Sequence, residues 1–266
     1  MSSGISVRLR AGKDKRGRDS LKEAGEQATG GETMLQKWEE LPEWMKNREV
    51  KEYYDVIARR RISLKLKRVF DILAAGILLG VLAVPMAVAA ACIVIDSPGG
   101  AVYRQERVTA CGKKFMICKF RTMTADAHKR GIQLTVEDDS RITGIGRVLR
   151  KYRLDELPQL FHVLEGTMTF VGTRPEVPEY VRAYTKEMRA TLLLPAGITS
   201  EASIRYKDEA KLLGGKAGAQ ADRIYREEVL PAKMKYNLES LKAFSVGNDM
   251  VTMVRTVAAV FGRKGT

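Results

Sequence analysis

The sequence predicts an α+β protein, mostly helical, that is anchored in a membrane. Three observations lead to this prediction. Residues 72–95 form a run of 24 residues without a charge, which is long enough for a bilayer helix. Residues 102–108 and 114–121 have strand character on either side of Gly112. Most of the chain beyond them has the apolar spacing of helices.

The composition limits the class of protein. A chain of 266 residues, 45% of them hydrophobic, suffices for one core with appendages. The net charge of +14 favours phosphates, anionic lipid or nucleic acid as partners, without distinguishing among them. The three cysteines include no C-x-x-C pair, and there are two histidines, which argues against a disulfide framework, a structural zinc site or a serine–histidine triad.

The N-terminal part divides into two segments. Residues 1–33 have too few large apolar side chains to offset the entropy of ordering, so we expect a disordered basic tail. Residues 34–66 have a helical pattern interrupted at Pro42. The basic end of this segment suits anionic lipid headgroups.

Residues 67–98 form the predicted membrane helix. A single span is the simplest interpretation of the hydropathy. However, Pro85 removes a hydrogen bond in the middle of the run and favours a kink. Basic residues also flank both ends, and both ends therefore prefer the cytoplasm. A kinked helix that enters and leaves on the same face would satisfy both features, so this path and the single span stay open at this point.

Beyond the predicted hairpin the chain is expected to be helical. A helix over residues 154–164 would have Asp155 as its N-cap, Pro158 in its first turn and Gly166 as its C-cap. Residues 221–261 indicate three helical stretches with breaks at Pro231 and near Gly247. The last of them is either a core helix or a helix in the membrane interface.

Asp155 and Glu156 are the most informative pair, because adjacent carboxylates sit beside Arg147, Arg150 and Arg153. One interpretation is structural, with Asp155 capping the helix and Glu156 favoured by its dipole. The other makes Asp155 a nucleophile for phosphorus, kept ionised by the nearby arginines. Carboxylates beside cations can also bind a magnesium diphosphate, with Asp155 and Glu156 as metal ligands.

Other cations are candidate phosphate ligands. Arg174 lies in a turn between glycine and proline, which presents it rigidly, although an exposed turn is an equally good interpretation. Lys119 and Arg121 end the second predicted strand and either bind phosphate or are exposed. No G-x-x-x-x-G-K-[ST] motif occurs, which weakens a kinase or ATPase interpretation.

From about residue 64 to residue 261 the chain resembles the bacterial sugar transferases, which are polyprenyl-phosphate phosphoglycosyl transferases of the monotopic type. The resemblance rests on the order of six motifs, which are Lys67-Arg68-Val69-Phe70-Asp71, Ser97-Pro98-Gly99, Arg104-Gln105-Glu106-Arg107-Val108, Lys119-Phe120-Arg121-Thr122-Met123, Asp139-Ser140-Arg141-Ile142-Thr143 and Leu154-Asp155-Glu156-Leu157-Pro158-Gln159-Leu160.

The resemblance implies a re-entrant helix broken at Pro85 and a catalytic domain on the cytoplasmic face of the bacterial inner membrane. It also implies that Asp155 attacks the sugar-bearing phosphate of a UDP-sugar, releases UMP, and passes the phosphosugar to polyprenyl (undecaprenyl) phosphate. Glu156 would assist as a Mg²⁺ ligand or base, and Arg150 and Arg174 would hold phosphates. Residues 99–230 would then be the catalytic domain, and residues 231–266 helices at or near the membrane surface.

The region from Ala196 to Ser203 departs from the family pattern, so Arg205 and Lys207 are carried over only as nucleotide or phosphate candidates. Arg147, close to Asp155 in the sequence, is a further candidate phosphate ligand. The implied partners are the UDP-sugar, polyprenyl phosphate and inner-membrane lipids, and not nucleic acid; self-association into a homo-oligomer is left open. Two other functions compete: a non-enzymatic basic membrane anchor, and a glycosyltransferase that releases UDP.

Overall fold

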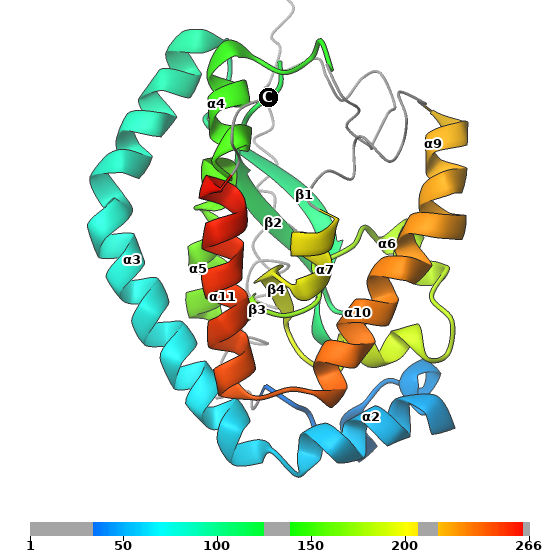
Figure 1. Ribbon diagram of the computed structural model, residues 1–266. Coiled ribbons are helices and arrows are strands. Elements are labelled where there is room, and N and C mark those ends of the chain that lie inside the picture. The colour runs from blue at the N-terminus through cyan, green and yellow to red at the C-terminus, as the bar shows by residue number, and fades with distance from the viewer. Residues whose placement is uncertain (1–33, 125–138, 207–217, 263–266) are drawn as a thin grey trace, which may run out of the picture. The chain divides into compact units, whose positions relative to one another are not determined.

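The computed structural model describes residues 34–124, 139–206 and 218–262. The chain divides into two units, residues 1–33 and residues 34–266, and the described residues all belong to the second. The predicted disordered tail therefore lies outside the described residues. Within the second unit, helices surround two small sheets (Figure 1), which agrees with the predicted α+β, mostly helical class.

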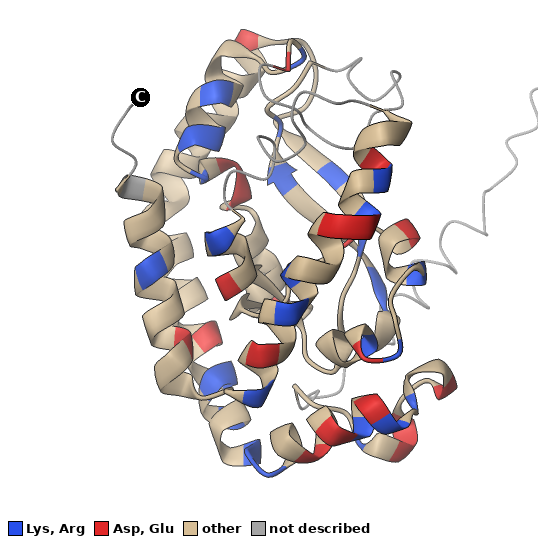
Figure 2. Cartoon of the chain, turned by 45° about the vertical axis from the view of Figure 1, so that its right-hand side comes forward, with Lys and Arg blue, Asp and Glu red and all other residues tan. Residues whose placement is uncertain are grey.

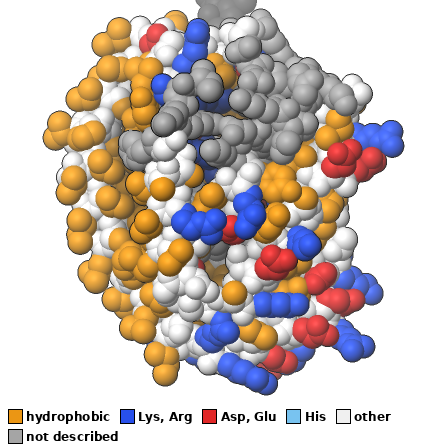
Figure 3. Space-filling model, viewed as in Figure 1, with side chains coloured by type: hydrophobic (Ala, Val, Ile, Leu, Met, Phe, Trp, Pro, Cys, Tyr) orange, Lys and Arg blue, Asp and Glu red, His pale blue; other side chains and the backbone are white. Residues whose placement is uncertain are grey.

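The long helix α3 (Arg61–Asp96) begins six residues before the predicted membrane segment, 67–98, and ends two residues before that segment does. Among the described helices, α3 alone is long and apolar enough to cross a membrane. Its apolar side chains, such as Val81 and Val84, are exposed. Hydrophobic side chains line the edge of the molecule along which α3 runs (Figure 3). The helix is continuous through Pro85, and it bows in Figure 1. A break at Pro85 and a re-entrant path therefore stay predictions.

The first turns of α3 are fastened to the rest of the unit by three charged residues. Lys67 donates to the Val171 carbonyl at 2.9 Å and pairs with Asp249 at 2.5 Å. Arg68 donates to two carbonyls near the end of α5 (Gln159–Glu165). Asp71 accepts the hydroxyl of Thr169 at 2.6 Å. Three buried or half-buried polar side chains thus fix the first turns of α3 against the rest of the unit.

The predicted hairpin is confirmed. Strands β1 (Val102–Val108) and β2 (Lys114–Phe120) pair antiparallel, with Val102 opposite Phe120 and Val108 opposite Lys114. The turn is a short 3₁₀ segment, η3 (Ala110–Gly112). The sequence did not reveal a second sheet, in which β3 (Met168–Val171) and β4 (Ala196–Thr199) run parallel.

The predicted cap at Asp155 is wrong. Helix α4 (Gly144–Lys151) is followed by the 3₁₀ turn η5 (Leu154–Glu156), and α5 begins only after Pro158. Arg153 has a left-handed backbone with φ 57°, which separates η5 from α4. The C-cap prediction is confirmed, because Gly166 ends α5 with φ 93°. Three short helices complete this half: α6 (Pro178–Arg182), η6 (Met188–Leu192) and α7 (Glu201–Arg205).

The C-terminal helices differ from the prediction at Pro231. Helix α9 (Ala219–Ile224), the π-helical turn η7 (Tyr225–Val229) and α10 (Leu230–Lys242) follow one another without an interruption. Pro231 lies two residues after the π-helical turn η7, and the helical backbone continues through it, so the expected break is absent. The second break is present, and Ser245 caps α11 (Val246–Phe261). Helix α11 packs Met253 inward and exposes Val254.

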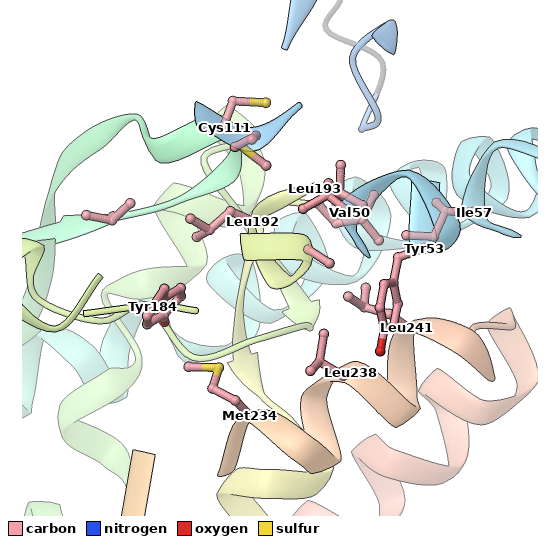
Figure 4. Close-up of a cluster of buried hydrophobic side chains, with 14 of the residues drawn as sticks. Val50, Tyr53, Ile57, Cys111, Tyr184, Leu192, Leu193, Met234, Leu238 and Leu241 are labelled. Carbon is pink, nitrogen blue, oxygen red and sulfur yellow. The ribbon is translucent and has the colours of Figure 1, made fainter. Parts of the chain in front are cut away.

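The N-terminal segment is part of the largest hydrophobic core. It consists of η1 (Trp38–Glu40), η2 (Glu43–Met45) and α2 (Arg48–Ala58). Val50 and Ile57 of α2 are fully buried and belong to the same core cluster as Leu193 and Leu241 (Figure 4). The outer face of α2 carries both signs of charge, whereas α3 is uncharged over most of its length (Figure 2).

Candidate active site

Asp155 and Glu156 lie in η5, the turn between α4 and α5, and this turn packs against β2. The left-handed residue Arg153 directs the chain into the turn. Glu156 is buried and Asp155 is half-buried. Two adjacent carboxylates in one tight turn thus have different surroundings.

Glu156 is held by cations from three elements. Arg174 donates to its Oε1 at 2.5 Å, and Lys119 of β2 lies 3.3 Å from the same atom. Arg153 lies 3.8 Å away. Burial raises the pKa of Glu156, but the charges of Arg174 and Lys119 outweigh this effect and hold the pKa well below its usual range. The Glu156 charge in turn raises the pKa of Arg174.

Asp155 has no such partner. Within the described part of the chain, no hydrogen bond holds its carboxylate. Burial raises the pKa of Asp155, and the neighbouring Glu156 charge adds to this, while Lys119, Arg150 and Arg174 act in the opposite direction. Asp155 is thus a half-buried carboxylate with cations nearby, and its oxygens accept no hydrogen bond from the described residues. These are the surroundings expected of a nucleophile.

Lys119 and Arg150 add positive charge around this carboxylate. Burial lowers the pKa of Lys119 to about 8, despite the opposing effect of Glu156. Arg150 of α4 donates through Nε to the Thr122 hydroxyl at 2.8 Å. Burial lowers the pKa of Arg150, and Asp155 partly offsets this effect. Asp155 therefore faces several cations in a partly desolvated site, the arrangement that stabilises a phosphate group.

Arg174 is positioned by a close crossing of two backbones. The Gly172 N–H donates to the Thr199 carbonyl at 3.0 Å, and the Gly197 N–H donates to the Thr173 carbonyl at 2.8 Å. A Cβ on Gly197 would lie only 2.2 Å from the nitrogen of Gly172, so no side chain fits there. The predicted rigid turn at Arg174 thus depends on contacts with residues 197–199, which no local sequence pattern places beside it.

The structure gives other partners to several predicted phosphate ligands. Arg121 donates to the carbonyls of Ser97 at 2.7 Å and Pro98 at 2.5 Å, and so closes the C-terminal end of α3. Arg205 pairs with Glu201 at 2.8 Å and lies over a tyrosine ring. Arg147 is exposed on α4, and Lys207 lies outside the described residues. The structure therefore brings together Lys119, Arg150, Asp155, Glu156 and Arg174 and leaves Arg121 and Arg205 in other contacts.

The sequence patterns did not predict a buried ionic group close to Arg174 in the chain. Glu176 accepts from Tyr225 and Lys233, and Arg107 lies close by. Arg107 belonged to a recognised motif, but nothing in the sequence pattern connected it with Tyr225 or Lys233, which lie far along the chain.

The acidic pair fits a metal only in part. Among the described residues there is no group of three His, Cys, Asp or Glu side chains that could hold a metal ion. The open carboxylate of Asp155 is a hard oxygen donor of the kind that Mg²⁺ accepts, whereas the Glu156 oxygens are already bound by Arg174 and Lys119. Of the two predicted metal ligands, Asp155 therefore has a carboxylate open to a metal ion among the described residues, whereas Glu156 does not.

Comparison with known proteins shows the family to which the chain is similar. The family model for bacterial sugar transferases matches residues 62–263. A Bacillus subtilis (strain 168) protein, provisionally named as an undecaprenyl-phosphate N-acetylgalactosaminyl 1-phosphate transferase, is 42% identical over 149 residues, covering 56% of this chain and 82% of the relative.

Two further relatives align over a longer part of the chain. The UDP-glucose:undecaprenyl-phosphate glucose-1-phosphate transferase of Caulobacter vibrioides is 31% identical over 204 residues, covering 75% of this chain and 72% of the relative. The UDP-N-acetylgalactosamine-undecaprenyl-phosphate N-acetylgalactosaminephosphotransferase of Aeromonas hydrophila is 32% identical over 198 residues, covering 73% of this chain but 43% of the relative. The resemblance of the motifs is confirmed, and the chain is a transferase that belongs to the bacterial sugar transferase family.

Proposed function

We propose that this chain transfers a sugar 1-phosphate from a UDP-sugar to undecaprenyl phosphate at the cytoplasmic face of the bacterial inner membrane. The relatives named for UDP-glucose or UDP-N-acetylgalactosamine, and for undecaprenyl phosphate, support both substrates. The observation that carries the mechanism is the contrast within η5, where Glu156 is neutralised by Arg174 and Lys119 while Asp155 is left open.

The first half-reaction uses that open carboxylate. An Asp155 oxygen attacks the phosphorus that bears the sugar, and the bond from this phosphorus to the bridging oxygen breaks. UMP leaves with the bridging oxygen and its electron pair, and the phosphosugar remains on Asp155 as an acyl phosphate. Arg150, Lys119 and Arg174 stabilise the negative charge that develops on the phosphate oxygens.

The second half-reaction regenerates the enzyme. A phosphate oxygen of undecaprenyl phosphate attacks the phosphorus of the acyl phosphate, and the bond between this phosphorus and the Asp155 oxygen breaks. The product is undecaprenyl diphosphate sugar, and Asp155 returns as a carboxylate. Glu156 holds Arg174 and Lys119 in place through both steps, because its carboxylate oxygens are bound by these two cations. This reaction would begin glycoconjugate or exopolysaccharide synthesis in the membrane.

Mg²⁺ bound at Asp155 and the diphosphate would supply charge neutralisation for the substrate. Turnover is therefore expected to stop in EDTA and to return when Mg²⁺ is added in excess. Full activity in EDTA would contradict this part of the proposal.

The apolar surface of α3 supports placement at the membrane, where the lipid substrate resides. The basic residues at both flanks of the segment support a cytoplasmic position for both ends. The re-entrant path through Pro85 and the cytoplasmic catalytic domain are part of this proposal.

The identity of the released nucleotide tests the proposed function. The purified protein in lipid nanodiscs is incubated with undecaprenyl phosphate and, separately, with UDP-glucose, UDP-N-acetylglucosamine or UDP-N-acetylgalactosamine. Formation of UMP together with a lipid diphosphate sugar is the expected result. Release of UDP would identify a glycosyltransferase instead, and absence of turnover with every donor would favour a non-enzymatic anchor.

A further inference from the structure

Two buried carboxylates, Glu156 and Glu176, act electrostatically on Arg174. Glu156 receives its guanidinium at 2.5 Å, and Glu176, two residues further along, contributes a second negative charge that favours the ionised arginine. Glu176 is only 5% exposed. The mechanism above assigns no role to this second carboxylate.

Glu176 is held by groups from the C-terminal helices and from β1. Its Oε1 accepts from the Tyr225 hydroxyl at 2.6 Å and from Lys233 Nζ at 3.4 Å. The Arg107 guanidinium lies 3.9 Å from Oε2. Burial raises the pKa of Glu176, but the charges of Lys233 and Arg107 outweigh it and lower the pKa below the ordinary value. A fixed negative charge is therefore maintained beside Arg174.

The main chain around Arg174 is tied to the same group. Arg107 donates to the Pro175 carbonyl at 3.1 Å, and the Val108 N–H donates to the Glu176 carbonyl at 3.0 Å. Arg174 is thus followed immediately by two residues that cannot shift without breaking contacts to β1. The position of the Arg174 Cα depends on Arg107 and Glu176 together.

The helical partner of Glu176 has an unusual backbone. Tyr225 begins the π-helical turn η7, and Lys233 lies in α10 directly after it. π-Helical turns are rare and are frequent at functional sites. Both side chains are buried, with 2% exposure for Tyr225 and 4% for Lys233. Replacing a buried ion pair with apolar residues of similar volume often leaves a protein equally stable. Stability alone therefore does not explain why this buried ionic group is present.

We propose that Glu176, held by Tyr225, Lys233 and Arg107, is a positioning residue that sets the location of the Arg174 guanidinium for binding the diphosphate of the nucleotide sugar. The inference rests on the proposed function, because that function gives Arg174 its phosphate. Glu176 does not touch substrate in this account, and it acts through Arg174 alone.

Three variants separate positioning from folding. Glu176→Gln removes the charge and leaves Lys233 and Arg107 uncompensated, so the melting temperature should fall. Glu176→Gln combined with Lys233→Met removes one charge of each sign, so the melting temperature should recover. In both, the KM for UDP-sugar is expected to rise about tenfold with a smaller change in kcat, because substrate binding through Arg174 is impaired. Tyr225→Phe, a milder change, keeps the test available if Glu176→Gln does not fold, and about a threefold rise in KM is expected.

The matched control is Glu179→Gln, the same chemical change three residues further along. Glu179 is half-exposed and pairs with Arg226 at 3.9 Å, so wild-type KM is expected. The dissociation constant for UDP, measured by calorimetry without an acceptor lipid, should follow the same order as KM. This binding readout does not require turnover.

A double-mutant cycle with Arg174→Ala decides whether Glu176 acts through Arg174. If it does, adding Glu176→Gln to Arg174→Ala has no further effect on the UDP dissociation constant. Additive effects of Glu176→Gln and Arg174→Ala on the UDP dissociation constant would overturn the inference. Wild-type KM and UDP affinity in the variant that combines Glu176→Gln with Lys233→Met would also overturn it. Failure of the proposed function is distinguishable, because then the wild-type protein would release no UMP. UDP binding that is unchanged in Arg174→Ala would overturn the positioning role directly.

Discussion

Glu156 Oε1 lies 2.5 Å from the Arg174 guanidinium, and this contact gives the two adjacent carboxylates of η5 different chemistry. The oxygens of Glu156 are committed to Arg174 and Lys119, whereas the carboxylate of Asp155 is available to substrate. Arg174 therefore has a fixed partner in Glu156, and its role in binding a phosphate is part of the proposed function.

Glu156→Gln tests this division of roles. The change removes the charge that holds Arg174 and Lys119, and the expected result is a loss of kcat by about a hundredfold or more, with transfer still occurring at Asp155. Rapid-quench measurement of UMP release gives the rate. Glu165→Gln is the matched control, because Glu165 is exposed at the end of α5 and should leave kcat unchanged. Wild-type kcat in Glu156→Gln would show that the ion pair is not needed.

The pH dependence of kcat/KM should have two limbs with assigned causes. Asp155 must be ionised to attack, and burial raises its pKa, so activity should begin to fall at a higher pH than for an ordinary carboxylate as the solution is acidified. Lys119, whose pKa is lowered to about 8, loses its charge above that pH, so activity should fall on the alkaline side as well. Lys119→Arg keeps a charge at high pH and should move the alkaline limb upward. An alkaline limb that is unchanged in this variant would remove Lys119 as its cause.

Membrane topology can be tested at the two ends of α3. Single cysteines at Arg59 and Gly100, both exposed positions, are introduced after Cys92, Cys111 and Cys118 are replaced. A re-entrant path predicts that a membrane-impermeant maleimide labels neither position in spheroplasts and both after the membrane is opened. Labelling of one position in intact spheroplasts would establish a single span.

The N-terminal segment, which lies outside the matched family region, should stabilise the catalytic unit. Ile57 is fully buried among core residues, so Ile57→Ala is expected to cost about 2–5 kcal/mol of unfolding free energy. Glu52→Ala on the exposed face of the same helix should cost about 0.5 kcal/mol or less. Chemical denaturation in detergent compares the two. Equal effects would mean that α2 is not part of the cooperative core.

Local patterns predicted much of this structure. The uncharged run marked the central part of α3, strand character on either side of Gly112 predicted the β1–β2 hairpin, and Gly166 marked the end of α5. The pairing of β3 with β4 is non-local and involves strands of four residues each, too short for a periodic signal.

In the candidate active site, too, local features were predicted from the sequence and tertiary contacts were not. Asp155, Glu156 and Arg174 stood out because carboxylates and a rigidly presented arginine are chemically distinctive in a sequence. The cap assigned to Asp155 was wrong because Arg153 adopts a left-handed backbone that residue type does not reveal. Arg121 looked like a phosphate ligand, but tertiary contacts bring it to the carbonyls at the end of α3.

The most direct measurement is the site of covalent labelling. Wild-type protein is incubated with a UDP-sugar labelled in the sugar and without acceptor lipid, and the account predicts label retained in a hydroxylamine-sensitive bond at Asp155 while UMP is released. Asp155→Asn keeps the size of the side chain and should abolish both labelling and turnover, with a loss of several orders of magnitude and no change in melting temperature. Labelling at another residue, or turnover of Asp155→Asn near the wild-type rate, would contradict the central claim.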